Sequence, residues 1–256
     1  MTNPYTQYPL MKPGETFQFT CQKCAKCCTN VLCSVMIESL DLFRLAQHFQ
    51  MDVADVANHY LEAVTIEGGA PVLILRTQGP DHACIFLKDN KCSIQNSGAK
   101  PRACRLYPLS VGPDGDLKKF LIFNVSGEKH HFKGRRFRAQ EWVAANFSEE
   151  DRAYISTEYR AMREFGRIFR RIPKHREDDV VFQMLKWRYF MFETDQPFIR
   201  QFVRNMALLK RELEKTLAIR QRREGKQTLS RQKKSRRPMW HIKNQSTTAH
   251  VITAAN

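Results

Sequence analysis

The chain has 256 residues, of which 42% are hydrophobic, and its formal net charge is +16 at neutral pH. This hydrophobic content supports a packed core and excludes a wholly disordered chain, and the length allows one sizeable domain or two small ones. No apolar run approaches the ~20 residues that a membrane helix requires, so we expect no membrane span.

Residues 1–16 are predicted to form an extended leader, because several prolines interrupt them. They lack the basic and then apolar segments of a secretory signal. We therefore expect a cytoplasmic protein, whose thiols stay reduced. Its eight cysteines then favour metal binding or catalysis over disulfides.

The segment 17–130 contains all the cysteines and is predicted to be a small, irregular metal-binding domain. Ser39 and Asp52 are each expected to cap a short helix. The sequence KDNKC at 88–92 predicts a tight hairpin turn. Short strands are expected at 72–75, 84–87 and 119–125. Little regular structure remains for the cysteine-bearing loops, where a metal can replace apolar packing.

The segment 131–220 has no cysteine and a helical pattern. Ser148 begins a capping-box pattern, and its helix should end before Pro173. Further helices are predicted around 180–192 and from Asp195, which gives a helical bundle or a cap over the cysteine domain. The predicted fold class is α+β, mainly helical. The segment's aromatic residues fit a core better than a ligand pocket; they are Phe165, Phe169, Trp187, Phe190, Phe192 and Phe198.

Residues 221–256 are predicted to form a basic, disordered tail. Between Arg220 and Lys243 the sequence has ten basic residues and one acidic residue, which supplies more than half of the net charge. Such a segment binds nucleic acid or another acidic surface by counterion release, or is simply solvated. An anionic partner is therefore one hypothesis, and no other partner is indicated.

The cysteine spacing is the most specific signal in the sequence. Cys21, Cys24 and Cys27 form a C-x2-C-x2-C run, which in bacterial ferredoxins presents three sulfurs to one iron–sulfur cluster. Zinc sites also use C-x2-C steps, and thiolates suit both metals. The run favours a 4Fe-4S cluster, with zinc as the alternative.

The same run ends in two adjacent cysteines. Neighbouring side chains on extended backbone point to opposite sides, so Cys27 and Cys28 are expected to serve two positions. Eight thiols would fill two tetrahedral zinc sites, or one cluster and a second mononuclear site.

Other candidate ligands are less certain. Cys33 has apolar neighbours and is equally well explained as a small buried side chain. His48, His59 and His82 are spare imidazoles. His82 is the one worth testing as a ligand, because it lies two residues before Cys84.

These motifs resemble the CxxCxxCC cysteine-cluster family, the YkgJ-type zinc- or iron-chelating domain. The matching stretches are CQKCAKCC, CIFLKDNKCSI and KPRACRLYPL, and Phe19 supplies the aromatic residue before the first cysteine. Ala25 stands where the family has glycine, and Lys100 where it has arginine. The resemblance covers roughly residues 17–112, and it implies metal or iron–sulfur binding with no settled reaction.

The spacing and the resemblance together predict the metal ligands. These are Cys21, Cys24, Cys27, Cys28, Cys84, Cys92 and Cys104, with Cys33 less certain. The cationic side chains of Lys26, Arg102 and Arg105 are expected to stabilise the thiolate charge and raise the cluster's reduction potential.

Three functions are compatible with the sequence. The first is a metal or iron–sulfur protein in which the metal has a structural, redox or sensing role. The second is a cluster-dependent enzyme, such as a protein lysine methylase, because a distant resemblance to flagellin lysine N-methylase implies one; the chain has no GxGxxG motif for a nucleotide. The third is a nucleic-acid-binding redox or metal sensor that uses the basic tail.

Overall fold

A computed structural model describes residues 9–32, 34–65, 70–111, 119–122, 130–172 and 176–235. The chain divides into two compact units, residues 1–217 and 218–256. Over the described ranges, every helix is too short or too polar to cross a membrane.

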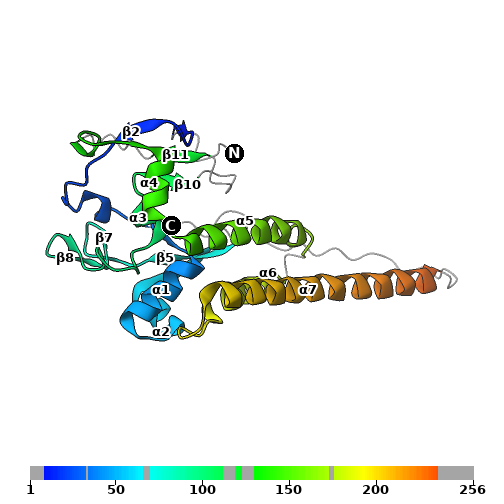
Figure 1. Ribbon diagram of the computed structural model, residues 1–256. Coiled ribbons are helices and arrows are strands. Elements are labelled where there is room, and N and C mark those ends of the chain that lie inside the picture. The colour runs from blue at the N-terminus through cyan, green and yellow to red at the C-terminus, as the bar shows by residue number, and fades with distance from the viewer. Residues whose placement is uncertain are drawn as a thin grey trace, which may run out of the picture. The chain divides into compact units, whose positions relative to one another are not determined.

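Helices dominate the described residues, and the strands are short, so the predicted α+β, mainly helical class is confirmed (Figure 1). The α-helices are α1 (Ser39–Phe49), α2 (Val53–Tyr60), α3 (Arg102–Leu106), α4 (Ala139–Asn146), α5 (Glu149–Phe169), α6 (Glu177–Leu185) and α7 (Phe198–Ser235). A 3-10 turn covers Lys26–Cys28, and a π-helical turn, Lys186–Phe190, follows α6.

The strands form five small antiparallel sheets. The three-stranded sheets are β1-β11-β10 (Leu10–Met11, Phe120–Ile122, Leu109–Val111) and β3-β5-β4 (Met36–Ile37, Pro71–Leu75, Leu61–Thr65). The two-stranded sheets are β12-β2 (Arg136–Arg138, Thr16–Gln18), β6-β7 (Thr77–Gln78, Ala83–Cys84) and β8-β9 (Leu87–Lys88, Lys91–Cys92). These short strands brace loops and turns and do not form an extended sheet.

Several predicted strands have different bounds. The expected strand 84–87 is divided between β7 and β8, because the chain turns between two hairpins there. The expected turn at 88–92 is confirmed, with Asp89 and Asn90 both at positive φ, as a two-residue hairpin turn requires. Of the expected strand 119–125, β11 covers Phe120–Ile122, and 123–125 lie outside the described residues.

The start of α1 corrects one prediction. Glu38, not Ser39, is the N-cap residue, and its side chain and that of Asp41 form a capping box. Ser39 is the first helical residue and is fully buried. A carboxylate at this position can cap the helix and still reach a neighbouring segment, which a serine hydroxyl cannot do.

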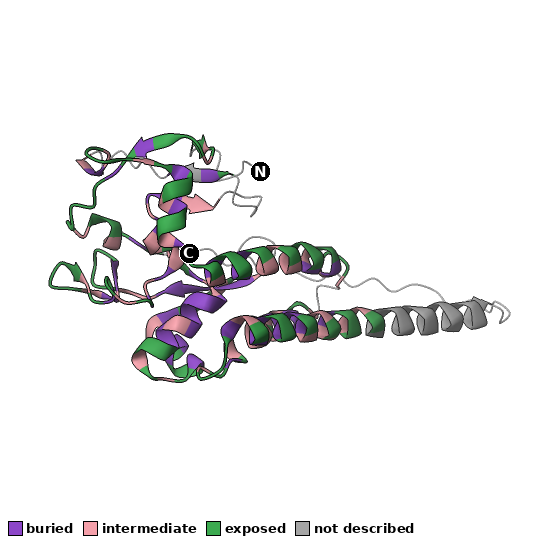
Figure 2. Ribbon diagram, viewed as in Figure 1, coloured by how far each residue is buried: buried purple, intermediate pink, exposed green. Residues whose placement is uncertain are grey.

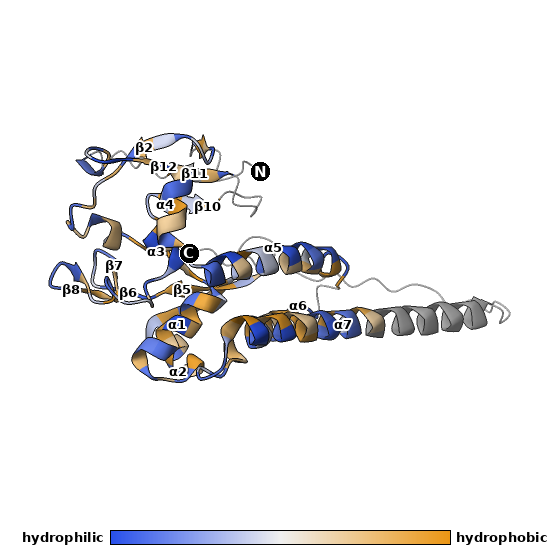
Figure 3. Cartoon of the chain, in the orientation of Figure 1, coloured by the Kyte–Doolittle hydropathy of each residue, from blue (hydrophilic) through white to orange (hydrophobic). Residues whose placement is uncertain are grey.

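The core is centred on α1 and β5. All five residues of β5 are buried, and α1 buries an apolar face that includes Leu42, Leu45 and Ala46 (Figure 2). In Figure 3, β5 is largely hydrophobic, whereas α1 carries both hydrophobic and hydrophilic residues, as an amphipathic helix does. β5 is the central strand of its sheet, between β3 and β4, which accounts for its complete burial.

The helical region packs onto this core. α5 and the first half of α7 run in the same direction, with Tyr154 against Phe198 and Phe202 at one end (Figure 1). Lys210 Nζ lies 2.5 Å from Glu164 Oε1 further along. The six aromatic residues named in the sequence analysis are buried in the core or packed against it, as predicted.

The predicted boundary at residue 220 lies inside a helix, because α7 continues to Ser235. The compact units meet at Leu217 and Ala218, three residues earlier. The other expected domain boundaries stay predictions, as does disorder in the rest of the tail.

Carboxylates hold α3 from both ends. At its first residue, Arg102 Nε donates to Glu38 Oε2 at 2.6 Å, and its backbone N–H donates to Asp41 Oδ1 at 2.9 Å. At the other end, Arg105 forms a two-pronged pair with Asp151, at 2.8 and 3.1 Å. Arg44 of α1 also reaches Asp151, at 2.7 Å. Helices α1, α3 and α5 are therefore joined through charged groups.

Asp151 is the centre of this arrangement. Burial raises its pKa, but hydrogen bonds from Arg105 and the Ser148 backbone, together with the charges of Arg105 and Arg44, lower the pKa well below its usual range. Because the folded-state pKa lies below the unfolded value, Asp151 stabilises the fold above about pH 4 and loses this contribution as the pH falls further.

Replacing Asp151 by asparagine should lower the free energy of unfolding by about 3–5 kcal/mol near neutral pH, because two guanidinium groups lose a buried partner. The deficit relative to wild type should narrow as the pH falls from about 5 to about 2. Urea unfolding at several pH values measures both effects. The exposed Lys210–Glu164 pair is the control, and Glu164→Gln should cost less than about 1 kcal/mol. Equal costs for the two variants would contradict the assignment.

Candidate metal centre

The cysteine run is fixed at its two ends to different parts of the fold. At its start, the Thr20 N–H donates to the His131 carbonyl at 2.9 Å. At its end, the N–H groups of Asn30 and Val31 donate to the carbonyls of Asp81 and His82, at 2.9 and 3.1 Å. The first half of the run therefore lies beside the segment after residue 130, and the second half beside the β6–β7 turn.

The first attachment depends on close packing. Phe19 is buried and makes edge contacts with His131, Tyr107 and Trp142. Gly134 has φ +87°, and a Cβ there would lie 2.4 Å from the Thr20 hydroxyl oxygen. Any larger residue at 134 would be strained at this φ and would displace the Thr20 hydroxyl, which lies next to Cys21.

Between the attachments the backbone is tightly curled. Lys23, Ala25 and Asn30 all have positive φ, and Ala25 leads directly into the 3-10 turn Lys26–Cys28. This turn places the Cys27 and Cys28 sulfurs 3.8 Å apart. The expectation that the adjacent cysteines point to opposite sides is therefore wrong, because it assumed extended backbone.

Three distant cysteines join this pair. Cys84 ends β7, Cys92 ends β9 opposite Leu87, and Cys104 lies in α3. Cys92 and Cys27 each help to raise the pKa of Cys84, and Cys84 and Cys27 help to raise that of Cys104, so these thiols lie near enough to interact electrostatically. We call this group the thiolate pocket; its members are Cys27, Cys28, Cys84, Cys92 and Cys104.

Burial and mutual repulsion disfavour the ionised forms of the cysteines in the thiolate pocket. The hydrogen bond with Cys27, then burial, then the neighbouring thiolates raise the pKa of Cys28 far above its usual value. Burial raises the pKa of Cys104 to about 12, with Cys84 adding to the increase. Burial is also the main cause of the raised pKa of Cys84. A bound metal cation would offset the free-energy penalty of ionising these buried, neighbouring thiols.

Two of the three cations expected near the pocket have other partners, and the prediction for Lys26 is untested. Arg102 and Arg105, which flank Cys104, direct their guanidinium groups to Glu38 and Asp151 instead. The cation that lowers the Cys104 pKa is Lys100. The two arginines thus position α3, because the buried carboxylates offer them paired hydrogen bonds.

A second group lies at the start of the run. Cys24 Sγ is 3.1 Å from His131 Nε2 and 3.4 Å from His130 Nε2. Within the described residues, this is the one set of three Cys, His, Asp or Glu side chains whose ligand atoms all lie within 4.8 Å of one another. We call it the Cys–His–His group.

The sequence interpretation missed both histidines. It selected His82, which is exposed at positive φ and contributes its carbonyl to the run's second attachment. The HH dipeptide at 130–131 was the signal available in the sequence, since imidazole and thiolate are both ordinary zinc ligands. Its partner, Cys24, lies more than 100 residues earlier in the sequence and could not be inferred from spacing.

Two predicted ligands, Cys21 and Cys33, belong to neither group. Cys21 is exposed, three residues before Cys24. Cys33 lies outside the described residues. All eight cysteines therefore stay predicted ligands, of which six fall into the two groups.

A region that gathers this many thiols and imidazoles defines a metal-chelating class of domain. Residues 20–134 match the family model of CxxCxxCC, which carries the description "Putative zinc- or iron-chelating domain". This match confirms, over residues 20–134, the resemblance seen in the sequence. A search of curated proteins found no match, and neither did a search of solved structures.

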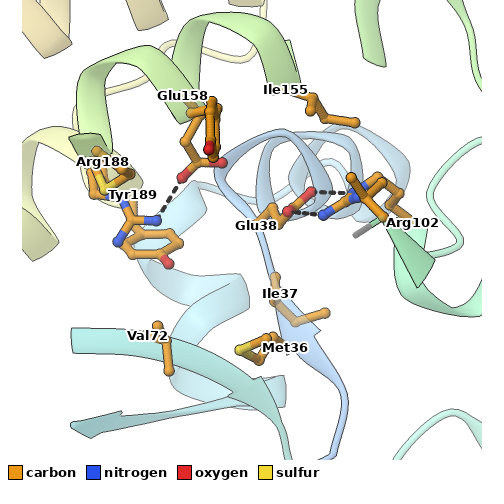
Figure 4. A pocket seen from close by; sticks show the side chains of 12 residues that line it. Met36, Ile37, Glu38, Val72, Arg102, Ile155, Glu158, Arg188 and Tyr189 are labelled. Carbon is orange, nitrogen blue, oxygen red and sulfur yellow. Dashed lines mark hydrogen bonds and ion pairs between the residues drawn. The ribbon is translucent and has the colours of Figure 1, made fainter. Parts of the chain in front are cut away.

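A separate cavity of about 320 Å³ has no cysteine among its lining residues (Figure 4). Two ion pairs border it, Glu38 with Arg102, and Glu158 with Arg188 at 2.5 Å. Arg188 is 7% exposed, and its Nε has no hydrogen-bond partner among the described residues. Burial raises the pKa of Glu38 to about 7 despite the nearby guanidinium of Arg102. The apolar lining is Met36, Ile37, Val72, Val111, Ile155 and Met162.

Ala25 offers a direct test of the curled run. Left-handed backbone costs a residue with a Cβ roughly 1–2 kcal/mol, and the family has glycine here. Ala25→Gly should therefore increase the free energy of unfolding by about 0.5–1 kcal/mol, after the added freedom of the unfolded chain is subtracted. Urea unfolding of metal-free protein measures the change.

The matched control is Ala103→Gly, at an exposed position inside α3. It should lower the free energy of unfolding by about 1 kcal/mol, since glycine disfavours a helix interior. A loss of stability in both variants would show that residue 25 does not adopt left-handed backbone.

Proposed function

We propose that the protein binds an iron–sulfur cluster, with 4Fe-4S favoured and zinc as the alternative, in the thiolate pocket. The observation that carries the proposal is the convergence of Cys27 and Cys28 with Cys84, Cys92 and Cys104. The bound metal has a structural, redox or sensing role.

The arrangement supports a cluster in two ways. Its cysteines come from four separate elements of the fold, a turn, two hairpins and a helix, as a cluster with ligands far apart in the sequence requires. The hydrophobic core reaches the pocket, because Cys84 belongs to it and Cys28 and Cys92 pack against it. A partly desolvated thiolate site of this kind suits soft metals, and burial tunes the potential of a cluster.

Metal content tests this proposal. Full-length protein purified without oxygen should contain stoichiometric iron and sulfide and show a broad visible absorption. Cys84→Ser and Cys104→Ser should each reduce the bound iron to less than about a tenth, because both remove a thiolate of the pocket. Ala103→Ser, beside Cys104 but exposed, is the control and should retain the metal. Colourless protein with zinc would favour the alternative, and protein that binds neither metal would contradict the proposal.

The cavity supports a second candidate function, a cluster-dependent enzyme such as a protein lysine methylase. A carboxyl group with a pKa of about 7, such as Glu38, can donate or accept a proton near neutral pH. The buried Nε–H of Arg188 can donate a hydrogen bond to a ligand oxygen. The cavity is therefore the best candidate for a substrate site in the described part of the chain.

Calorimetry with S-adenosylmethionine tests the methylase form of this candidate. Binding should be weakened at least about tenfold by Met162→Trp, because the larger side chain fills the cavity. Met191→Trp changes an exposed methionine outside the cavity and should bind normally. If wild-type protein shows no heat of binding and no change in cluster spectrum, the methylase form is excluded.

A role for the basic tail remains a separate proposal. Deletion of residues 221–256 should abolish salt-sensitive binding to nucleic acid if the tail supplies the contact, since phosphate contacts release counterions.

A further inference from the structure

We propose that Cys24, His130 and His131 form a second, mononuclear metal site that binds Zn²⁺ independently of the thiolate pocket. This goes beyond the proposed function, which requires only the pocket. It also changes the role of Cys24, which spacing alone assigned to the same cluster as Cys27.

The distances fit a tetrahedral zinc ion. Zn–S bonds of about 2.3 Å and Zn–N bonds of about 2.0 Å place ligand sulfur and nitrogen about 3.5 Å apart. The Cys24 sulfur lies 3.4 Å from one Nε2 and 3.1 Å from the other. All three ligand atoms fall within 4.8 Å. The side chains therefore already surround a point that an ion of this size can occupy, with little rearrangement.

The donor set selects the metal. One thiolate and two imidazoles are borderline-soft ligands that suit Zn²⁺, whereas iron–sulfur clusters are held chiefly by thiolates. The thiolate pocket and the Cys–His–His group therefore differ in ligand chemistry as well as in residues. Iron and zinc can occupy the two sites of one molecule.

The surroundings hold the group in place. His131 is 2% exposed, its ring meets that of Phe19 edge-on, and its carbonyl accepts the Thr20 N–H. The two imidazole rings are 4.2 Å apart between centroids. The chain that carries Cys24 is thus anchored to the same residue that supplies a ligand, which lowers the entropy lost on metal binding.

The three protein ligands leave the fourth coordination position of a tetrahedral zinc ion open. Cys24 is exposed, so solvent can reach the group. Water can complete it, as in catalytic zinc sites, or Cys21 can, because a C-x2-C step directs two sulfurs to one metal. X-ray absorption at the zinc edge distinguishes one sulfur ligand from two.

The test loads full-length protein with Zn²⁺ after the pocket has been given its own metal. Wild-type protein should hold one equivalent of zinc with two nitrogen ligands. His130→Ala should lose this equivalent and leave the metal of the pocket unchanged. Cys84→Ser should do the reverse. His82→Ala changes an exposed histidine outside both groups and should lose neither.

His130 is the preferred variant, because His131 is buried and its removal risks unfolding the region. Zinc absorption spectra of the wild-type protein give a second readout that needs no variant. Full zinc retention in His130→Ala, or a zinc environment of sulfur alone, would overturn the proposal. If neither metal binds the pocket but His130-dependent zinc persists, the proposed function fails and this site stands.

Discussion

Helix α3 carries Cys104, and carboxylates hold it at both ends. Glu38 and Asp41, at the start of α1, bind Arg102, and Asp151, at the start of α5, binds Arg105. A five-residue helix has too few hydrogen bonds to be stable by itself, so these contacts fix it. Both carboxylate groups lie at helix N-termini, where the helix dipole favours negative charge. The position of Cys104 therefore depends on the helical core rather than on the cysteine loops.

The same contacts couple the core to the metal centre. Arg44 and Arg105 share Asp151, so α1, α3 and α5 cannot shift independently without leaving a buried charge unpaired. The helical region is thus part of what shapes the thiolate pocket. Arginine is suited to this role because its planar group forms paired hydrogen bonds with a carboxylate.

Two attachments divide the cysteine run, and this explains its density of thiols. Its start is bonded to His131 and its end to Asp81 and His82. Cys24 consequently lies with two histidines, and Cys27 and Cys28 lie with the distant cysteines. The sequence interpretation predicted two metal positions, divided between Cys27 and Cys28, and their number stays a prediction. The tight 3-10 turn keeps those two together, and the division falls before them.

The sequence by itself determined the class of the domain, because the thiol spacing and the CRLYP stretch are specific local patterns. It also determined α1, α2, the helix from Ser148 and the 88–92 turn, since periodicity, caps and turn residues act over a few residues. Only the tertiary structure decided which ligands meet. The pairing of Cys24 with His130 and His131, and of Arg102 and Arg105 with carboxylates, joins residues about 45 to 107 positions apart. Such contacts depend on how the whole core packs, which no local pattern records.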